Sequence, residues 1–382
     1  MKQGWEIKKL GEIAKIINGK NQKQVISDDG KYPIYGSGGN IMGYATEYIC
    51  EKGSTIIGRK GNISNPIFIN ERFWNVDTAF GIYPKNQSDP KFLNYLCQTI
   101  DFKSRNKGTT IPSLVKSDLQ TIEIPFIGSL PEQQRIVAIL DEAFAAIAKA
   151  KANAEQNLKN AKELFESYLQ GVFKNKLHGS QFEKLDNLCE LIVDCEHKTA
   201  PTQETGYPSV RTPNIGKGVL ILEGVNRVSE KTYDEWTRRA IPQADDLILA
   251  REAPAGNIAV IPENVKVCLG QRTVLIRPKK SKIVSKFLAH LILSKDVQEQ
   301  LLSHSTGATV EHINMKDIRA FKIFDLSPLT EQQTIVQKLD ALSTETKKLE
   351  AIYQLKKTDL EELKKSILQK AFAGQLPMEN RQ

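Results

Sequence analysis

The sequence of 382 residues has few cysteines and no long apolar run. Its five cysteines are scattered and odd in number, so no disulfide framework is expected. No stretch approaches the ~18 apolar residues that a membrane-spanning helix needs, and the opening MKQGWEIKKL lacks the apolar core of a signal peptide. We therefore expect a soluble, cytoplasmic protein without membrane contacts.

Catalytic motifs are also missing. The nearest match to the Asn/Asp/Ser-Pro-Pro-Tyr/Phe tetrad of DNA methyltransferases is Asn65–Phe68, which lacks the second proline and follows no Gly-rich cofactor turn. A phosphate-binding Gly-x-x-x-x-Gly-Lys-Ser/Thr loop is absent, as is the acidic motif of restriction nucleases. Cys189, Cys195 and His197 do not have the spacing of a zinc site. We predict no catalytic residue, no metal ligand and no cofactor in this chain.

The net charge of +8 is distributed unevenly along the chain. Residues 1–130 carry a net charge of +5 and residues 174–329 carry +3, whereas 131–173 and 330–382 are close to neutral at −1 and +1. Two basic blocks suit a polyanion such as DNA, although many mildly basic proteins bind none. The length predicts two or three domains, each large enough to bury a core.

The chain contains an internal repeat. Pro131–Asp141 reads Pro-Glu-Gln-Gln-Arg-Ile-Val-Ala-Ile-Leu-Asp and recurs as Thr330–Asp340, an offset of 199 residues. The same offset relates Ser167–Phe173 to Ser366–Phe372, so no insertion separates these segments. Such a long period excludes a solenoid and predicts two whole domains in tandem.

Both repeated segments have the apolar spacing of long helices. Apolar residues alternate at steps of three and four through 131–173 and through 330–382, with Lys151, Thr346 and Lys356 in seam positions. Each helix alone could simply pack on its own domain. Two helices of equal length, each closing a domain, instead favour an antiparallel coiled coil with pseudo-two-fold symmetry, which would hold two domains at a fixed separation.

The remaining parts, 1–130 and 174–329, have mixed composition. Ser54–Ile57 and Asp246–Leu249 have the composition of strands, and Lys91–Ile100 and Ser285–Ser294 that of helices. We expect an α+β protein: a mixed α/β domain over 1–130, a helix over 131–173, a second such domain over 174–329, and a helix with a tail over 330–382.

This organisation resembles the specificity subunit of type I restriction–modification systems over essentially the whole chain. The segments that carry the resemblance, besides the repeated Glu-Gln-Gln helices, are Trp5–Ile13, Tyr35–Asn40, Ile57–Asn62, Phe73–Phe80 and Leu368–Leu376. In the second half Ala250–Ala253 replaces Gly-Arg-Lys-Gly. This departure suggests that the two halves read different sequences.

The resemblance implies a non-catalytic subunit that binds double-stranded DNA, with one target recognition domain for each half of a split target. It also implies two modification (methyltransferase) subunits that carry S-adenosylmethionine, and restriction subunits that add translocation and cleavage. We expect the helices to dock the modification subunits, with these partner-binding residues: Leu140, Phe144, Leu339 and Leu342.

General DNA chemistry selects the candidate contacts. Arginine can donate two bonds to guanine, asparagine and glutamine can pair with adenine, and lysine neutralises phosphates. The candidates in the first half are Ser37, Asn40, Arg59, Lys60, Asn62, Arg105, Lys107, Thr109 and Thr110. Those in the second half are Arg211, Asn214, Arg251, Asn257, Gln271, Arg272, His304, Thr309 and His312. For each of them a surface ion pair or a turn cap is the alternative.

Two other functions are alternatives to this interpretation. A two-domain coiled-coil adaptor would recruit proteins without reading DNA, and would show no salt-dependent retention on duplex DNA. A self-contained methyltransferase would transfer methyl groups alone, which the missing tetrad argues against.

If the helices set the gap between half-sites, their length should control it. Inserting four residues near Ala150 adds about one turn, ~6 Å. The methylated motif, mapped in cells that carry the variant, should keep both half-sites and gain about one or two base pairs between them, because B-DNA advances ~3.4 Å per base pair. An active variant with an unchanged gap would contradict this role of the helices.

Overall fold

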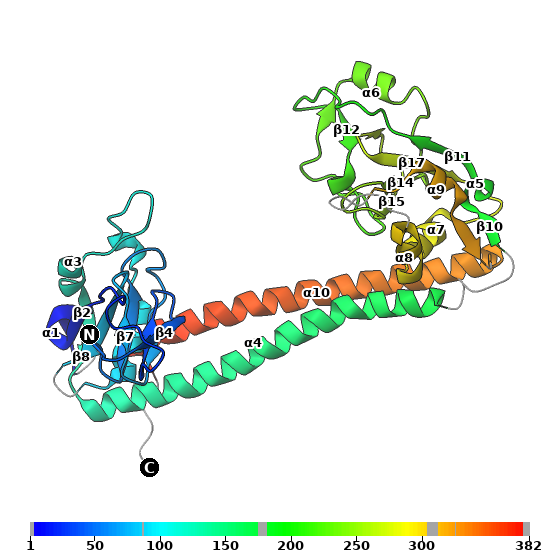
Figure 1. Cartoon of the computed structure of the whole chain (residues 1–382). Helices are drawn as coiled ribbons and strands as arrows, with labels where there is room; N and C mark the ends of the chain where they lie inside the picture. The colour runs from blue at the N-terminus through cyan, green and yellow to red at the C-terminus, as the bar shows by residue number, and fades with distance from the viewer. Residues whose placement is uncertain (1–3, 86–87, 175–181, 304–311, 325, 377–382) are drawn as a thin grey trace, which may run out of the picture. The chain divides into compact units, whose positions relative to one another are not determined.

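The computed structural model describes residues 4–85, 88–174, 182–303, 312–324 and 326–376, which form two compact units. The first unit combines 1–155 with 354–382, and the second spans 156–353. The long helices α4 (Leu130–Phe173) and α10 (Leu329–Phe372) each contribute to both units (Figure 1). No helix among the described residues is long and apolar enough to cross a membrane.

The globular part of the first unit is built on a four-stranded antiparallel sheet of order β2-β8-β5-β6. A three-stranded sheet, β4-β3-β7, contains one parallel pair, and β1 pairs with β9. The strands are β1 (Trp5–Lys9), β2 (Ala14–Asn18), β3 (Tyr32–Tyr35), β4 (Ile41–Ala45), β5 (Ser54–Gly58), β6 (Ile67–Ile69), β7 (Trp74–Asn75), β8 (Ala79–Pro84) and β9 (Glu123–Ile127). The helices are α1 (Leu10–Ile13), α2 (Pro90–Thr99), η1 (Lys103–Arg105) and α3 (Lys116–Gln120).

The second unit repeats this topology. Its sheets have the orders β11-β17-β14-β15, β13-β12-β16 and β10-β18, again with one parallel pair, β12 with β16. The strands are β10 (Phe182–Lys184), β11 (Cys189–Asp194), β12 (Tyr207–Val210), β13 (Arg227–Val228), β14 (Leu247–Ala250), β15 (Ile258–Val260), β16 (Cys268–Leu269), β17 (Thr273–Pro278) and β18 (Lys322–Phe324). The helices are α5 (Leu185–Leu188), η2 (Thr212–Asn214), α6 (Glu230–Trp236), α7 (Ser285–Ile292), α8 (Lys295–Ser303) and α9 (Met315–Ala320).

Strand register shows which residues of the two domains are equivalent. Gly58 pairs with Ala79 in the first domain, and Ala250 pairs with Thr273 in the second. The next residue along each central strand is an arginine, so Arg59 corresponds to Arg251. The repeat therefore includes the parts whose sequences have diverged, and the expected α+β class with two tandem mixed domains is confirmed.

The long helices pack antiparallel, as the seam pattern predicts. In the first unit the start of α4 shares a core with the end of α10, through Leu140 and Phe372. In the second unit the end of α4 shares a core with the start of α10, through Phe173 and Leu339. The seam residue Lys151 forms an ion pair with Glu361 at 2.5 Å, so a charge in the seam is accommodated by a partner.

A buried glutamine joins each domain to its long helix. The Gln133 side chain donates from Nε2 to the Ile127 carbonyl oxygen at 2.7 Å and accepts at Oε1 from the Asp89 backbone N–H at 2.8 Å. Gln332 makes the same pair of bonds with Ser327 and Val284, both at 2.8 Å. These are the first glutamines of the repeated Glu-Gln-Gln segments, and each ties the start of α2 or α7 to its long helix.

Replacing Gln133 with alanine should destabilise the protein by about 2–3 kcal/mol, because the partly buried N–H of Asp89 and the buried carbonyl of Ile127 lose their partners. The measurement is the shift in the urea midpoint of the full chain. Gln134→Ala is the matched control, since the neighbouring Gln134 side chain is exposed. Equal shifts of the urea midpoint for the two variants would contradict a stabilising role for the Gln133 side-chain hydrogen bonds.

Candidate nucleic-acid interface

In the first domain two distant segments meet at one end of the central sheet. The loop after β5 and the loop over 106–113 are joined by backbone bonds from Gly61 to Pro112 and from Leu114 to Arg59, each 2.9 Å. These two loops and the adjacent η1 hold seven of the predicted residues: Arg59, Lys60, Asn62, Arg105, Lys107, Thr109 and Thr110. All are exposed except Arg59, which is half-buried.

Arg59 keeps most of its hydrogen-bonding capacity. Its Nη1 donates a long bond of 3.4 Å to the Asp77 carbonyl oxygen, and its guanidinium lies 5.9 Å from the centre of the Phe80 ring. In the described part of the chain no carboxylate lies within ion-pairing distance of it. The side chain is thus positioned by the ring and free to donate to a ligand.

Asn106 fixes the second loop and was missed by sequence reasoning. Its Oδ1 accepts from the backbone N–H groups of Gly108 and Ser113, both at 2.8 Å, and its Nδ2 donates to the Gly108 carbonyl at 3.0 Å. The Asn-x-Gly pattern typical of side-chain-capped turns was its only signal. The loop that carries Lys107, Thr109 and Thr110 is therefore held in shape without a ligand.

Ser37 and Asn40 lie in the turn between β3 and β4. The Gly36 N–H donates to the Asn40 carbonyl at 3.0 Å, which closes the turn. Gly39 has a φ of +79° and lies against Ile67 at the start of β6, so a side chain there would be both strained and obstructed. This contact places the turn beside the strand that follows the Asn62 loop.

Arg251 does not lie on the surface as a base contact would. It is 7% exposed and pairs with Asp194 at 2.5 Å. Its Nε donates to the Ile313 carbonyl at 2.9 Å, and its Nη2 lies 3.0 Å from Nε2 of His312. With its donors occupied inside the domain, Arg251 is placed to support its neighbours.

Arg272 has the opposite environment. Its side chain is 62% exposed and its Nη1 pairs with Oε2 of Glu252 at 2.6 Å. The other Glu252 oxygen lies 3.1 Å from Nδ1 of His312. Gln271, next to it, donates a 3.4 Å bond to the His197 carbonyl. Arg272, Gln271 and His312 are thus brought together at the end of the sheet.

The remaining candidates of the second domain form backbone bonds or lie apart. The Asn214 amide accepts from the Arg211 N–H at 3.1 Å and donates to Ile221 at 3.3 Å, which makes it a turn cap. Asn257 donates to the Ile215 carbonyl at 2.9 Å. Arg211 is exposed. The predictions for His304 and Thr309 fall outside the described residues.

Asp194, Cys195 and His197 come close enough to suggest a metal site, with potential ligand atoms within 4.8 Å of one another. Their chemistry argues against one. Burial raises the pKa of the Cys195 thiol, and its sulfur accepts the backbone N–H of Arg272 at 3.1 Å. The Asp194 carboxylate is already neutralised by a guanidinium. These groups are better explained as parts of an ion-pair network.

The predicted partner-binding leucines are corrected by the structure. Leu140 and Leu339 are fully buried in the cores of the two units, so no partner can contact them in this fold. Phe144 packs edge-on against Tyr95, and Leu342 is half-buried. Exposed apolar positions lie elsewhere on the helices. They include Leu164 of α4 and Leu363 of α10, which are 49% and 47% exposed, together with Tyr168, Leu349, Ile352 and Leu355.

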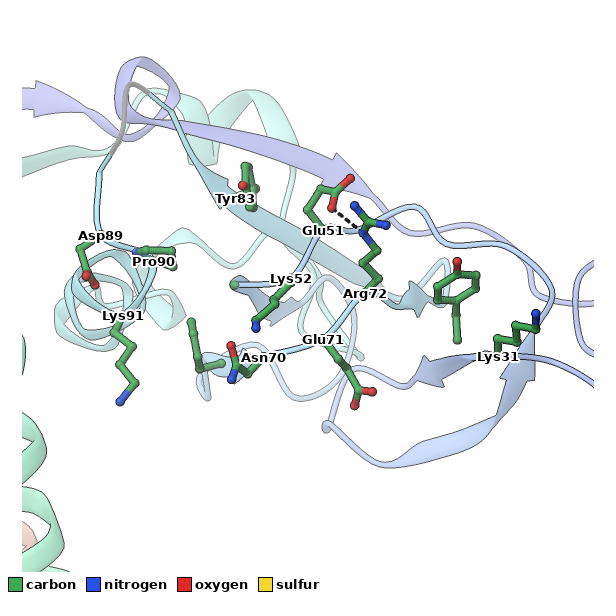
Figure 2. A pocket seen from close by; sticks show the side chains of 13 residues that line it. Lys31, Glu51, Lys52, Asn70, Glu71, Arg72, Tyr83, Asp89, Pro90 and Lys91 are labelled. Carbon is green, nitrogen blue, oxygen red and sulfur yellow. Dashed lines mark hydrogen bonds and ion pairs between the residues drawn. The ribbon is translucent and has the colours of Figure 1, made fainter.

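Figure 2 shows a surface hollow of about 750 Å³ in the first domain. Gly53, just before β5, lines this hollow, whereas Arg59 follows the other end of the strand. Arg72 in its wall pairs with Glu51 at 3.0 Å, and Lys91 pairs with Asp141 at 2.6 Å. Because Arg72 and Lys91 already have carboxylate partners, and Glu71 and Asp89 also line the hollow, it is a weaker candidate for a polyanion than the end that carries Arg59.

Comparison with known proteins gives consistent matches along the chain. The family model described as "Type I restriction modification DNA specificity domain" matches residues 2–159 and 179–358. The chain is 24% identical to the EcoBI specificity subunit of Escherichia coli, over 84% of this chain and 73% of that protein. It is 22% identical to the EcoDI specificity subunit of the same organism, over 97% and 88%.

Two solved structures share the fold. The HsdS subunit from Thermoanaerobacter tengcongensis aligns with a TM-score of 0.61 and 20% identity over 98% of each chain. A chain from a structural study of complex assembly and conformational transition in a type I restriction–modification system aligns with a TM-score of 0.77 and 18% identity, over 98% of this chain and 99% of that one.

Proposed function

Because the chain belongs to the type I restriction–modification DNA specificity family, we propose that it reads a two-part DNA target, one half-site per domain. Recognition of the DNA target is the role of a specificity subunit, and catalysis is not. What remains to be proposed is how the target is divided and which residues read it.

One observation carries the proposal: the same strand-end framework occurs twice, with different groups facing outward. In the first domain Arg59, on the loop after β5, is half-buried and keeps free donors. In the second domain the equivalent Arg251 is buried and Arg272 is exposed instead. Two copies of one scaffold that present different donors at different points suit two half-sites of different sequence.

The two kinds of basic residue have different tasks. Exposed lysines such as Lys60 and Lys107 neutralise phosphates and release counterions, which gives affinity that falls with salt and carries no sequence information. Arginines such as Arg59 can donate two bonds to O6 and N7 of guanine in the major groove. The paired helices α4 and α10 set the number of unread base pairs between the half-sites.

Partners supply the chemistry. Two modification subunits, which carry S-adenosylmethionine and methylate adenine, dock on the long helices. Restriction subunits add DNA translocation and cleavage, and the complex works in the cytoplasm. Leu164 and Leu363 support two docking sites. They are 199 residues apart, the offset of the repeat, and both are about half exposed, so each helix presents the same apolar position.

Arg59→Ala should weaken binding by about 1–3 kcal/mol and relax the preference in one half-site only. Binding of the complex to duplexes randomised in both half-sites measures this. Lys60→Ala is the matched control, because losing a phosphate contact should weaken all sequences equally. If Arg59→Ala lowered the affinity for all sequences equally, Arg59 would be a phosphate contact. If the unaltered protein showed no sequence preference, the adaptor function would be favoured.

Replacing both Leu164 and Leu363 with aspartate should abolish co-purification of a methyltransferase subunit, because each change places a charge in a desolvated interface. Leu355→Asp is the control: Leu355 is 62% exposed, but its counterpart in α4 is Gln156, so it does not belong to a duplicated surface. Complex formation by the double variant would contradict docking at these positions.

A further inference from the structure

We propose that Arg272 is the base-reading arginine of the second domain and is oriented for that task by a relay, a chain of hydrogen-bonded polar groups that starts at Asp194 and the buried Arg251. The relay residues are Asp194, Arg251, His312 and Glu252. This inference rests on the proposed function, and it names both the residue that reads the second half-site and the residues that position it.

Strand register defines what has changed between the two domains. Arg59 donates its backbone N–H to the Thr78 carbonyl, and Arg251 donates in the same way to Arg272, so Arg272 occupies the position of Thr78. Asn18 pairs with Phe80 and Asp194 with Val274, so Asp194 occupies the position of Asn18.

The exchange of Asn18 for Asp194 explains why Arg251 is buried and ion-paired whereas Arg59 is not. The exposed Asn18 is neutral, and Arg59 keeps free donors. Asp194 places a carboxylate at the same point, 18% exposed, and forms an ion pair that holds Arg251 in the interior. The exchange of a neutral side chain for a carboxylate therefore explains why Arg251, the equivalent of Arg59, is buried in the second domain and does not donate at its surface.

Each link of the relay has a defined donor and acceptor. The Arg251 guanidinium can only donate, so Nε2 of His312 accepts its bond, and the ring proton of His312 is on Nδ1. Nδ1 then donates to Oε1 of Glu252, 3.1 Å away. The second Glu252 oxygen accepts from Arg272 at 2.6 Å. A continuous chain thus runs from the interior to an exposed guanidinium.

The backbone of Arg272 is held as tightly as its side chain. Its φ is +68°, a left-handed conformation that is uncommon for residues other than glycine. Its N–H donates to the Cys195 sulfur at 3.1 Å, and its carbonyl accepts from Arg251 at 2.9 Å. Backbone conformations of this kind persist where the surroundings enforce them, which is common at binding sites.

This support suits base reading better than phosphate binding. A phosphate contact gains nothing from a carboxylate 2.6 Å from the cation, because Glu252 weakens the attraction for an anion. A base contact gains orientation, since Glu252 fixes one part of the guanidinium and leaves other N–H groups to face a base edge. Two such donors match O6 and N7 of guanine. The second half-site should therefore contain a guanine read by Arg272.

The test uses the full-length chain in complex with its modification subunit and duplexes randomised in both half-sites. Arg272→Lys keeps the charge and removes the planar fork, and should lower the preference for guanine at one position of the second half-site by about tenfold or more. The first half-site should be unchanged. Arg59→Lys is the reciprocal control and should alter the first half-site alone.

Glu252→Gln tests the positioning role. It should relax the same base position by a smaller factor, and adding it to Arg272→Lys should cause no further loss, because the two residues act as one unit. A variant that lowers the melting temperature but leaves the motif intact would show that Glu252 is only structural, and would overturn the relay.

Arg272→Lys with an unchanged second half-site, in a complex that still reads two half-sites, would overturn the role of Arg272 and leave the proposed function standing. A loss spread equally over all sequences would also overturn it, by making Arg272 a phosphate contact. Only an unaltered complex without preference in either half-site would remove the proposed function itself.

Discussion

The side-chain amide at the start of each long helix is the interaction on which the rest of the arrangement depends. Gln133 and Gln332 are buried, and each satisfies one backbone donor and one backbone acceptor of the adjoining domain. Around each amide a surface ion pair adds a second attachment, Lys91 with Asp141 and Lys286 with Asp340, both at 2.6 Å. A helix can hold its domain in a defined orientation only if such a junction is rigid.

The two domains show how one scaffold acquires two surfaces. Three strands of the central sheet keep the same register, and the backbone bonds around Arg59 and Arg251 are the same. The differences are single charges at the strand ends, such as Asp194 where the first domain has Asn18. A carboxylate beside an arginine costs the scaffold little, because the pair is hydrogen-bonded on several sides, yet it decides whether that arginine is inside or outside.

Sequence reasoning succeeded where the signal was local and repeated. The long helices and their pairing follow from an apolar spacing that occurs twice, without a proline inside either run. The two mixed domains follow from the repeat and from the composition of 1–130 and 174–329. Reasoning from single positions did less well. Leu140 and Leu339 fit a seam pattern, but the same apolar face also packs on the globular domains, and periodicity cannot separate the two.

The site was harder to predict because its determinants are far apart in the chain. Nothing near Arg251 in the sequence indicates that Asp194, 57 residues earlier, neutralises it. Asn106 was overlooked because its role is to bond to the backbone of its own loop, which residue type alone does not indicate. The arginines, lysines and loops were identifiable by residue type, whereas their exposure was set by tertiary contacts.

The first compact unit takes its final core residues from the far end of the chain. Leu368, Ala371 and Phe372 share a core with Phe92 and Leu140, so this unit remains incomplete until residue 372 has left the ribosome. In the meantime its apolar surface is exposed, and the contact that closes it has a very large sequence separation. A chain that terminated before Leu368 would thus lack part of the core of this domain as well as the end of α10, which makes assembly of the domain depend on synthesis of the second long helix.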